Sequence, residues 1–140
     1  MDFSYYNTQI HGITATDVKN MPTFPSIWAE LKGYLNNNIV LAHNASFDMS
    51  VLKSILNTYN LEKPNFKYYC TVSLAKKVWP ELENHKLNTL ASYFNINFKH
   101  HNALHDSKVC AMVAVLATRK LNSKNFAQLI TKLNLKDNKF

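Results

Sequence analysis

The chain has 140 residues, of which 46% are hydrophobic and 18% are charged, so it is long enough for one domain with a sizeable core. This balance excludes an intrinsically disordered chain, and no stretch is long or apolar enough to span a membrane. The formal net charge of +7 comes almost entirely from lysine, with Arg119 as the sole arginine. Such a charge favours polyanionic partners, attracted through their phosphates rather than read base by base.

Both cysteines lie in apolar surroundings along the chain. Cys70 follows two tyrosines, and Cys110 falls on the apolar face of a predicted helix, so both are expected to be buried free thiols. Free thiols suit a reducing compartment, and the polar start at Met1 does not resemble a signal peptide. We therefore expect a cytoplasmic protein.

The amino-terminal part of the chain carries modest signals. Residues 3–9 are predicted to form a short strand or an ordered arm. Thr14 followed by Asp17 resembles a capping box, which predicts a short helix directly afterwards. A stronger helix is expected after Thr23, because apolar residues then recur at helical spacing.

The segment Ile39–Asp48 runs from an apolar core stretch into polar side chains. Its first four residues, Ile39–Ala42, are rich in β-branched types, which is typical of a strand covered on both faces. From Phe47 the apolar spacing becomes that of a helix, with Asp48 in its first turn. Since α/β sheets bind ligands at the carboxyl ends of their strands, Asp48 is placed to hold a metal ion. The simpler alternative is a carboxylate that stabilises the helix dipole.

The rest of the chain is predicted to alternate a strand with helices. Thr71 is expected to cap the helix that follows the strand, because threonine is favoured at that position. The predicted elements are a strand over 66–70, helices over 71–79 and 87–94, a helix beginning just beyond Asp106, a helix over 126–133, and a Lys-rich tail over 132–140.

A second polar cluster precedes the helix that begins beyond Asp106. His101 and Asp106 are five residues apart, so a loop histidine and a helix carboxylate can face one pocket. A carboxylate can hold a divalent ion, and an imidazole can take a proton from water near neutral pH. This pairing suits the cleavage of phosphodiesters.

Three other interpretations concern the histidines and cysteines of the chain. Zinc could bind His101 and His105 together with Cys70 and Cys110, but structural zinc sites prefer close ligand pairs at both ends of the site. The histidine cluster also fits a solvated polar loop. His43, directly after the predicted strand, also fits a hydrogen-bonded core histidine.

Three motifs in this order resemble the DEDDh (DnaQ-like) family of 3'-5' exonucleases. They are Ile10–Thr14 (IHGIT), His43–Asp48 (HNASFD) and His101–Asp106 (HNALHD). The likeness is greatest to the proofreading exonuclease domain of bacterial DNA polymerase III, in its epsilon-subunit and PolC forms, and it runs from about Gln9 to about Leu116.

The resemblance implies roles for individual residues. In the family, four acidic residues bind two Mg²⁺ or Mn²⁺ ions and a histidine activates the attacking water. Asp48 and Asp106 match two of the metal-binding aspartates, and His101 matches the general base. The residues matching positions that contact the 3'-terminal nucleotide are His11, Phe47, Asn44 and Ile10.

The resemblance also implies an α/β, ribonuclease H-like exonuclease fold over residues 1–118, followed by a C-terminal helix and Lys-rich tail over 119–140. The family's first motif, an Asp-x-Glu pair on the first strand, has no match upstream of His11. We therefore expect a fold truncated at the N-terminus, with weakened, single-ion metal binding.

Three functions stay open at this point. The first is 3'-5' exonucleolysis of nucleic acid with a free 3' end, DNA being favoured, with activity weakened or lost and with a DNA polymerase as a candidate partner. The second is a non-catalytic nucleic-acid-binding module. The third is an interaction protein that self-associates through the open edge of its sheet.

Overall fold

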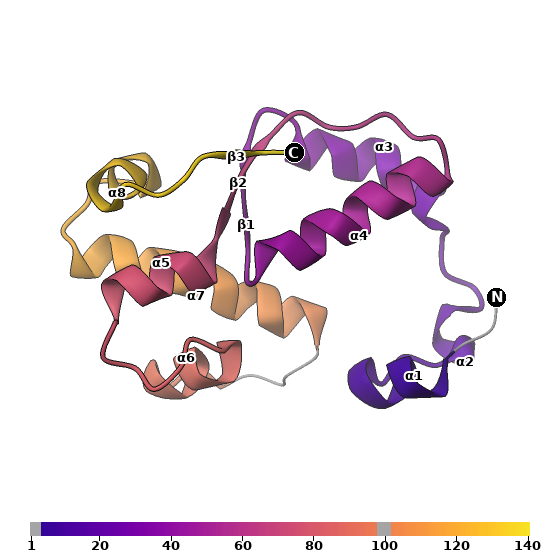
Figure 1. The fold of residues 1–140 in the computed structure, drawn as a ribbon. Coiled ribbons are helices and arrows are strands. Elements are labelled where there is room, and N and C mark those ends of the chain that lie inside the picture. Colours follow the sequence, from indigo (N-terminus) through magenta and orange to yellow (C-terminus); the bar gives the residue numbers. More distant parts are fainter. Residues whose placement is uncertain (1–3, 98–101) are drawn as a thin grey trace.

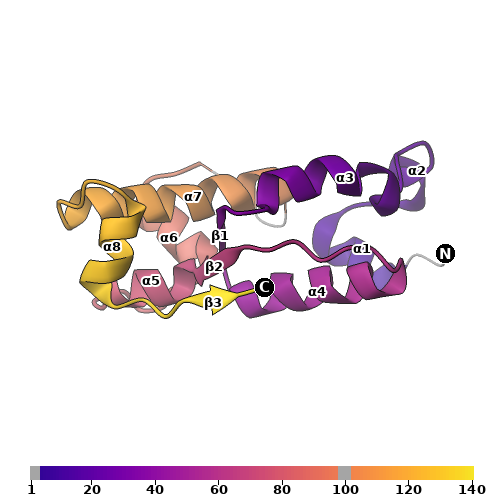
Figure 2. The ribbon, with the colours of Figure 1, turned by 90° about the horizontal axis from the view of Figure 1, so that it is seen from above.

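The computed structural model describes residues 4–97 and 102–140, and these form a mixed α/β fold. The strands are β1 (Ile39–Ala42), β2 (Lys67–Cys70) and β3 (Asn138–Lys139). The helices are α1 (Tyr5–His11), α2 (Ala15–Val18), α3 (Phe24–Leu35), α4 (Ala45–Thr58), α5 (Thr71–Val78), α6 (Leu87–Tyr93), α7 (Ala103–Lys120) and α8 (Phe126–Leu133). The strands stand in the middle, with α3 and α4 on one side and α5, α6 and α8 on the other (Figures 1 and 2).

The sheet has the order β1-β2-β3. β1 and β2 are parallel, with Ala42 opposite Cys70, so their carboxyl ends share one edge of the sheet. The strand predicted over Ile39–Ala42 is confirmed, but its complete coverage is wrong, because Ile39 is 46% exposed. Among the described residues, no strand pairs with the outer side of β1.

The main hydrophobic core lies between the sheet and the helices α5, α7 and α8. Val109 and Val113, predicted on the apolar face of α7, are both fully buried. The larger buried side chains of this core are Tyr69, Leu74, Val78, Trp79, Leu90, Val113, Leu129 and Leu135. The long helix α7 also reaches a second, smaller cluster through Val109. Because α7 packs against both α6 and β1, its amino-terminal turn lies near the end of β1.

The apolar face predicted for α4 is buried only in part. Phe47 is 65% exposed and Val51 is 50% exposed, whereas Met49 and Leu56 are buried. The helix rests on β1 and β2 through the side that carries Met49 and Leu56, so the residues next to this side remain open to solvent. Phe47 and Val51 are therefore apolar residues of α4 that the fold leaves at the surface.

The strand or arm predicted over residues 3–9 is also wrong, because α1 is a helix. Ser4 caps it by accepting a hydrogen bond from the Asn7 N–H. Gly12, in the left-handed region at φ 71°, ends it by donating to the Thr8 carbonyl. These two cap residues outweigh the strand preference of the tyrosines between them. The capping box predicted downstream is confirmed, with Thr14 as the N-cap of α2.

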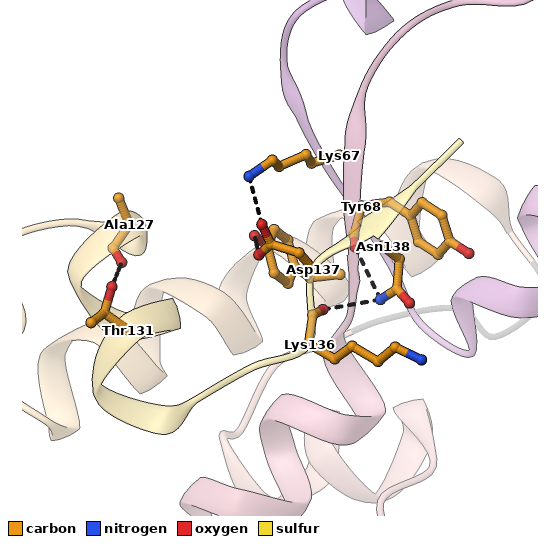
Figure 3. A network of polar contacts seen from close by, with 8 residues as sticks. Lys67, Tyr68, Ala127, Thr131, Lys136, Asp137 and Asn138 are labelled. Atoms are coloured by element: carbon orange, nitrogen blue, oxygen red, sulfur yellow. Dashed lines mark hydrogen bonds and ion pairs between the residues drawn. The ribbon is translucent and has the colours of Figure 1, made fainter.

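The carboxyl-terminal residues belong to the folded structure and do not form a solvated tail. After α8, Leu135 is buried and β3 pairs antiparallel with β2. The Asp137 carboxylate accepts a hydrogen bond from the Lys67 ammonium (Figure 3). It also accepts one from the Tyr69 hydroxyl. The ring of Phe140 stacks on the ring of Phe66, the residue just before β2, with the ring centroids 4.8 Å apart.

Two further expectations concern the whole chain. The division into 1–118 and 119–140 stays a prediction; α7 continues through residue 118 to Lys120. In the part of the chain that the structure describes, no helix is long and apolar enough to cross a membrane.

Candidate active site

A cavity of about 1190 Å³ opens where the carboxyl end of β1 meets the helices α4, α5, α6 and α7. This is the edge at which open α/β sheets bind their ligands. The polar residues that line it are His43, Asn44, Asp48, Lys76, Glu83, Asn84, His85, Lys86, Asn88, Asp106 and Ser107. The cavity therefore combines carboxylates, imidazoles, amides and lysines contributed by distant parts of the chain.

Two carboxylates line the cavity from two different helices. Asp48 lies in the first turn of α4 and Asp106 in the first turn of α7, each four residues after an asparagine N-cap. The positive ends of the helix dipoles stabilise both carboxylates. Asn102 caps α7 through its side chain, which accepts from the His105 N–H, whereas Asn44 places the turn before α4 in the left-handed region at φ 66°.

Asp48 lies where the cavity walls change the pKa of its carboxyl group. Its side chain is open to the cavity, yet the surrounding walls withdraw water, and this burial raises the pKa of its carboxyl group. A bound cation would offset this effect, because it stabilises the charged form. The local environment thus favours the carboxylate when a positive charge is present.

The donor set fits one hydrated divalent cation. Oxygen ligands suit Mg²⁺ or Mn²⁺, and Mg²⁺ is commonly held by one or two carboxylates together with several waters. Within residues 4–97 and 102–140, no group of three or more His, Cys, Asp or Glu side chains converges on a point that could hold a metal ion. Asp48 and Asp106 would therefore share the ion with water.

His43 holds the inner wall of the cavity together. Its Nδ1 lies 2.9 Å from Thr71 Oγ1, and its Nε2 lies 3.0 Å from the His85 carbonyl oxygen. A carbonyl only accepts, so Nε2 carries the proton and donates it, while Nδ1 accepts from the Thr71 hydroxyl. Burial lowers the pKa of His43, which agrees with this neutral form. The prediction of a hydrogen-bonded histidine is confirmed, but His43 is half-buried at the cavity and not part of the core.

Thr71 is a buried member of this network and not a helix cap. It is fully buried, and Cys70 occupies the N-cap position of α5 instead. The Thr71 hydroxyl contacts His43 and also Cys110, whose Sγ lies 3.5 Å away. Thr71 Oγ1 also lies 3.4 Å from the Ala42 carbonyl oxygen, so the threonine joins β1, α5 and α7 behind the cavity.

The two cysteines are free thiols, as predicted, but only Cys110 is fully buried. Burial raises the pKa of the Cys110 thiol. Burial also opposes ionisation of Cys70, but backbone N–H groups at the starts of two helices outweigh it and lower the pKa of that thiol. These N–H groups belong to Ser73, Ala45, Val72 and Asn44.

Of the four residues predicted to contact substrate, Asn44 and Phe47 lie at the cavity. Phe47 leaves most of its ring exposed, which allows a base to stack on it. Ile10 and His11 do not line the cavity, since α1 lies apart from the sheet in both views (Figures 1 and 2). His11 Nδ1 instead accepts a local hydrogen bond from the Ile13 N–H. His101, the predicted general base, lies outside the described residues.

The sequence did not predict the two lysines that line the cavity. Lys76 projects from α5, and Lys86 is the N-cap residue of α6. The available signal for Lys76 was its spacing of four residues from Val72, which places both on one side of α5. For Lys86, the polar sequence after Pro80 does not predict which element the loop approaches, because only the tertiary structure brings that loop to the end of β1.

The fold and the paired helix carboxylates define a ribonuclease H-like exonuclease domain. The model of the exonuclease family RNase_T matches residues 2–114, and the chain belongs to this family. This confirms the resemblance drawn from the three sequence motifs.

Several relatives share this domain. The chain is 36% identical over 104 residues to a PolC-type DNA polymerase III of Listeria welshimeri, covering 74% of this chain and 7% of the relative. It is 32% identical over 117 residues to the PolC-type enzyme of Oceanobacillus iheyensis, covering 83% of this chain and 8% of the relative. It is 33% identical to the DNA polymerase III epsilon subunit of Buchnera aphidicola, covering 79% of this chain and 47% of the relative. The chain thus spans a small part of the PolC-type relatives and about half of the epsilon subunit.

A solved structure has the same fold. It is that of exonuclease X in complex with 5' overhanging duplex DNA, with a TM-score of 0.68 at 23% sequence identity. The match covers 92% of this chain and 75% of the other.

Proposed function

We propose that this domain is a 3'-5' exonuclease that removes nucleotides from a nucleic acid strand by metal-dependent hydrolysis. DNA is the favoured substrate. The observation that carries the proposal is the convergence of Asp48 and Asp106 on one large cavity at the carboxyl end of β1. Family membership supports it, because exonucleases of this family generally use divalent metal ions.

The roles of the residues follow from their chemistry. Asp48 and Asp106 would hold Mg²⁺ or Mn²⁺, an ion that lowers the pKa of a bound water and stabilises the departing oxygen. Phe47 stacks on the terminal base and Asn44 donates to the terminal nucleotide from the same edge of the cavity. His101 is proposed as the general base on its match to the family motif. Ile10 and His11 remain proposed contacts on the same ground.

The experiment is hydrolysis of a 3'-labelled single strand with Mg²⁺ or Mn²⁺. Asp48→Asn and Asp106→Asn are each expected to lower the rate by about 100-fold or more, since removing a charge interaction of about 3 kcal/mol corresponds to that factor. Glu30→Gln is the matched control, because Glu30 is exposed on α3 and its substitution removes the same charge. Equal rates for all four proteins would refute the proposed site.

Metal binding can be measured apart from catalysis. Mn²⁺ should raise the melting temperature of the unaltered chain, because a ligand that binds only the folded state stabilises it. The increase should be lost in Asp48→Asn and Asp106→Asn and retained in Glu30→Gln. An increase that survives both aspartate substitutions would place the ion elsewhere.

The second candidate is a non-catalytic nucleic-acid-binding module. The observation that favours it is that, within the described residues, no group of three or more His, Cys, Asp or Glu side chains could hold a metal ion, while the chain carries a net charge of +7. It predicts salt-sensitive binding without hydrolysis, with binding unchanged by Asp48→Asn or Asp106→Asn.

We further propose that the open side of β1 pairs with another strand, in the first instance from a second copy of the chain. Unpaired edge strands present free backbone groups that promote such pairing, and Ile39 adds an exposed apolar side chain. Sedimentation should show a dimer that Ile39→Lys converts to a monomer, because an edge lysine opposes pairing. A monomeric unaltered chain would refute this proposal. A DNA polymerase is a further proposed partner, on the names of the relatives.

A further inference from the structure

The helices that contribute lysines to the cavity lining differ from those that contribute its two aspartates. The carboxylates of Asp48 and Asp106 come from α4 and α7, whereas Lys76 comes from α5 and Lys86 from the start of α6. Both lysines are exposed. Glu83 also lines the cavity, on the loop that leads to Lys86, so the lysines leave the α5–α6 side with a net positive charge.

The backbone that carries Lys86 is held in place on both sides. The Asn84 side chain accepts hydrogen bonds from the Lys86 N–H, at 3.0 Å, and from the Thr89 hydroxyl, at 2.6 Å. The neighbouring His85 carbonyl accepts from His43, and the His85 Nε2 lies 2.9 Å from the Trp79 carbonyl oxygen. The backbone of Lys86 is therefore preorganised, so that binding of a ligand has to order only the side chain.

Lys76 is fixed by the packing of its helix. Its neighbours in α5, Leu74 and Ala75, are buried in the main core, so the helix presents the ammonium from a rigid support. Two lysines on rigid elements, beside carboxylates that would repel a phosphate, supply the attraction that a polyanionic strand needs in order to enter.

We propose that Lys76 and Lys86 form a phosphate-binding side of the cavity, which contacts the sugar-phosphate backbone of a single-stranded nucleic acid next to Asp48 and Asp106. This inference rests on the proposed function only in placing the strand in this cavity. Lysine contacts phosphates as a point charge, so the binding is independent of base sequence.

The test compares two double variants that lose the same charge. One is Lys76→Gln with Lys86→Gln. The control is Lys19→Gln with Lys63→Gln, whose lysines are exposed and do not line the cavity. The probe is a fluorescein-labelled single-stranded oligothymidylate, titrated by anisotropy in EDTA at several NaCl concentrations so that no metal-dependent cleavage occurs.

The expected result is a change in the salt dependence of binding. The slope of log K against log salt is negative, and for a single strand every lysine–phosphate interaction that is removed reduces its magnitude by about 0.7. The magnitude should therefore be smaller by about 1.4 in the cavity variant and by much less in the control. Equal slopes and affinities for the two double variants would overturn the inference, as would an unaltered chain that does not bind at low salt.

The proposed function can fail separately. A chain that binds the probe through Lys76 and Lys86 but hydrolyses nothing with Mg²⁺ or Mn²⁺ keeps this inference and loses catalysis. A chain that hydrolyses its substrate, with equal binding by both double variants, keeps catalysis and loses this inference.

Discussion

Replacing Thr71 by valine removes one hydroxyl from behind the cavity and leaves the shape of the side chain nearly unchanged. Thr71 is fully buried, and its Oγ1 lies 2.9 Å from His43 Nδ1. Valine fills the same space, so little packing is lost. His43 Nδ1, however, loses the hydrogen bond that it accepts on the side that faces the fully buried Thr71.

The cost follows from this unsatisfied nitrogen. A group left without its partner costs about 1–3 kcal/mol. The longer contacts of Thr71 Oγ1, at 3.5 Å to the Cys110 sulfur and 3.4 Å to the Ala42 carbonyl oxygen, add little because long hydrogen bonds and bonds to sulfur are weak. The free energy of unfolding should therefore fall by about 1–3 kcal/mol in Thr71→Val. Thr58→Val is the matched control. Its hydroxyl is exposed and bonds only within α4, so its effect should stay within about 0.5 kcal/mol.

A double-mutant cycle with His43→Leu isolates the contact. Urea unfolding of the unaltered chain, both single variants and the double variant gives the coupling energy, which should reach at least about 0.5 kcal/mol for residues in contact. His43→Leu should also speed amide hydrogen exchange over residues 80–86, because the His85 carbonyl in that loop loses its hydrogen bond from His43. The reasoning is refuted if Thr71→Val is neutral and its effect adds independently to that of His43→Leu.

Three further predictions concern titration and stacking. Cys70 should react with iodoacetamide faster than Cys110 near neutral pH, as read by peptide mass after timed quenching, and equal rates would contradict the opposite directions of their pKa shifts. Burial and the hydrogen bond to Asp137 raise the pKa of Tyr69 to about 12, so the stability from its protonated hydroxyl is complete below pH 10 and lost as pH rises through about 12. Unfolding curves at increasing alkaline pH should show this loss, and Tyr69→Phe should not. Phe47→Ala should weaken binding of single-stranded DNA by about 1–3 kcal/mol without lowering the melting temperature, and unchanged affinity would exclude stacking on its ring.

The amino-acid sequence by itself determined the local elements that position the carboxylates. The strand at Ile39–Ala42, the helix turn that contains Asp48 and the capping box at Thr14 all follow from side chains within a few residues of one another. Such signals depend on backbone geometry and on the nearest turn, which a linear pattern records. The family motifs added the expectation that Asp48 and Asp106 act together.

Only the tertiary structure decided what surrounds these carboxylates. His43 meets partners 28 and 42 residues away along the chain, and Tyr69 meets Asp137 across 68 residues. The exposure of Phe47 and the folding of the last residues against β2 were likewise invisible in the pattern. Helical spacing shows which residues share a face, but whether that face is covered depends on elements distant in sequence, and so does the basic side of the cavity at Lys76 and Lys86.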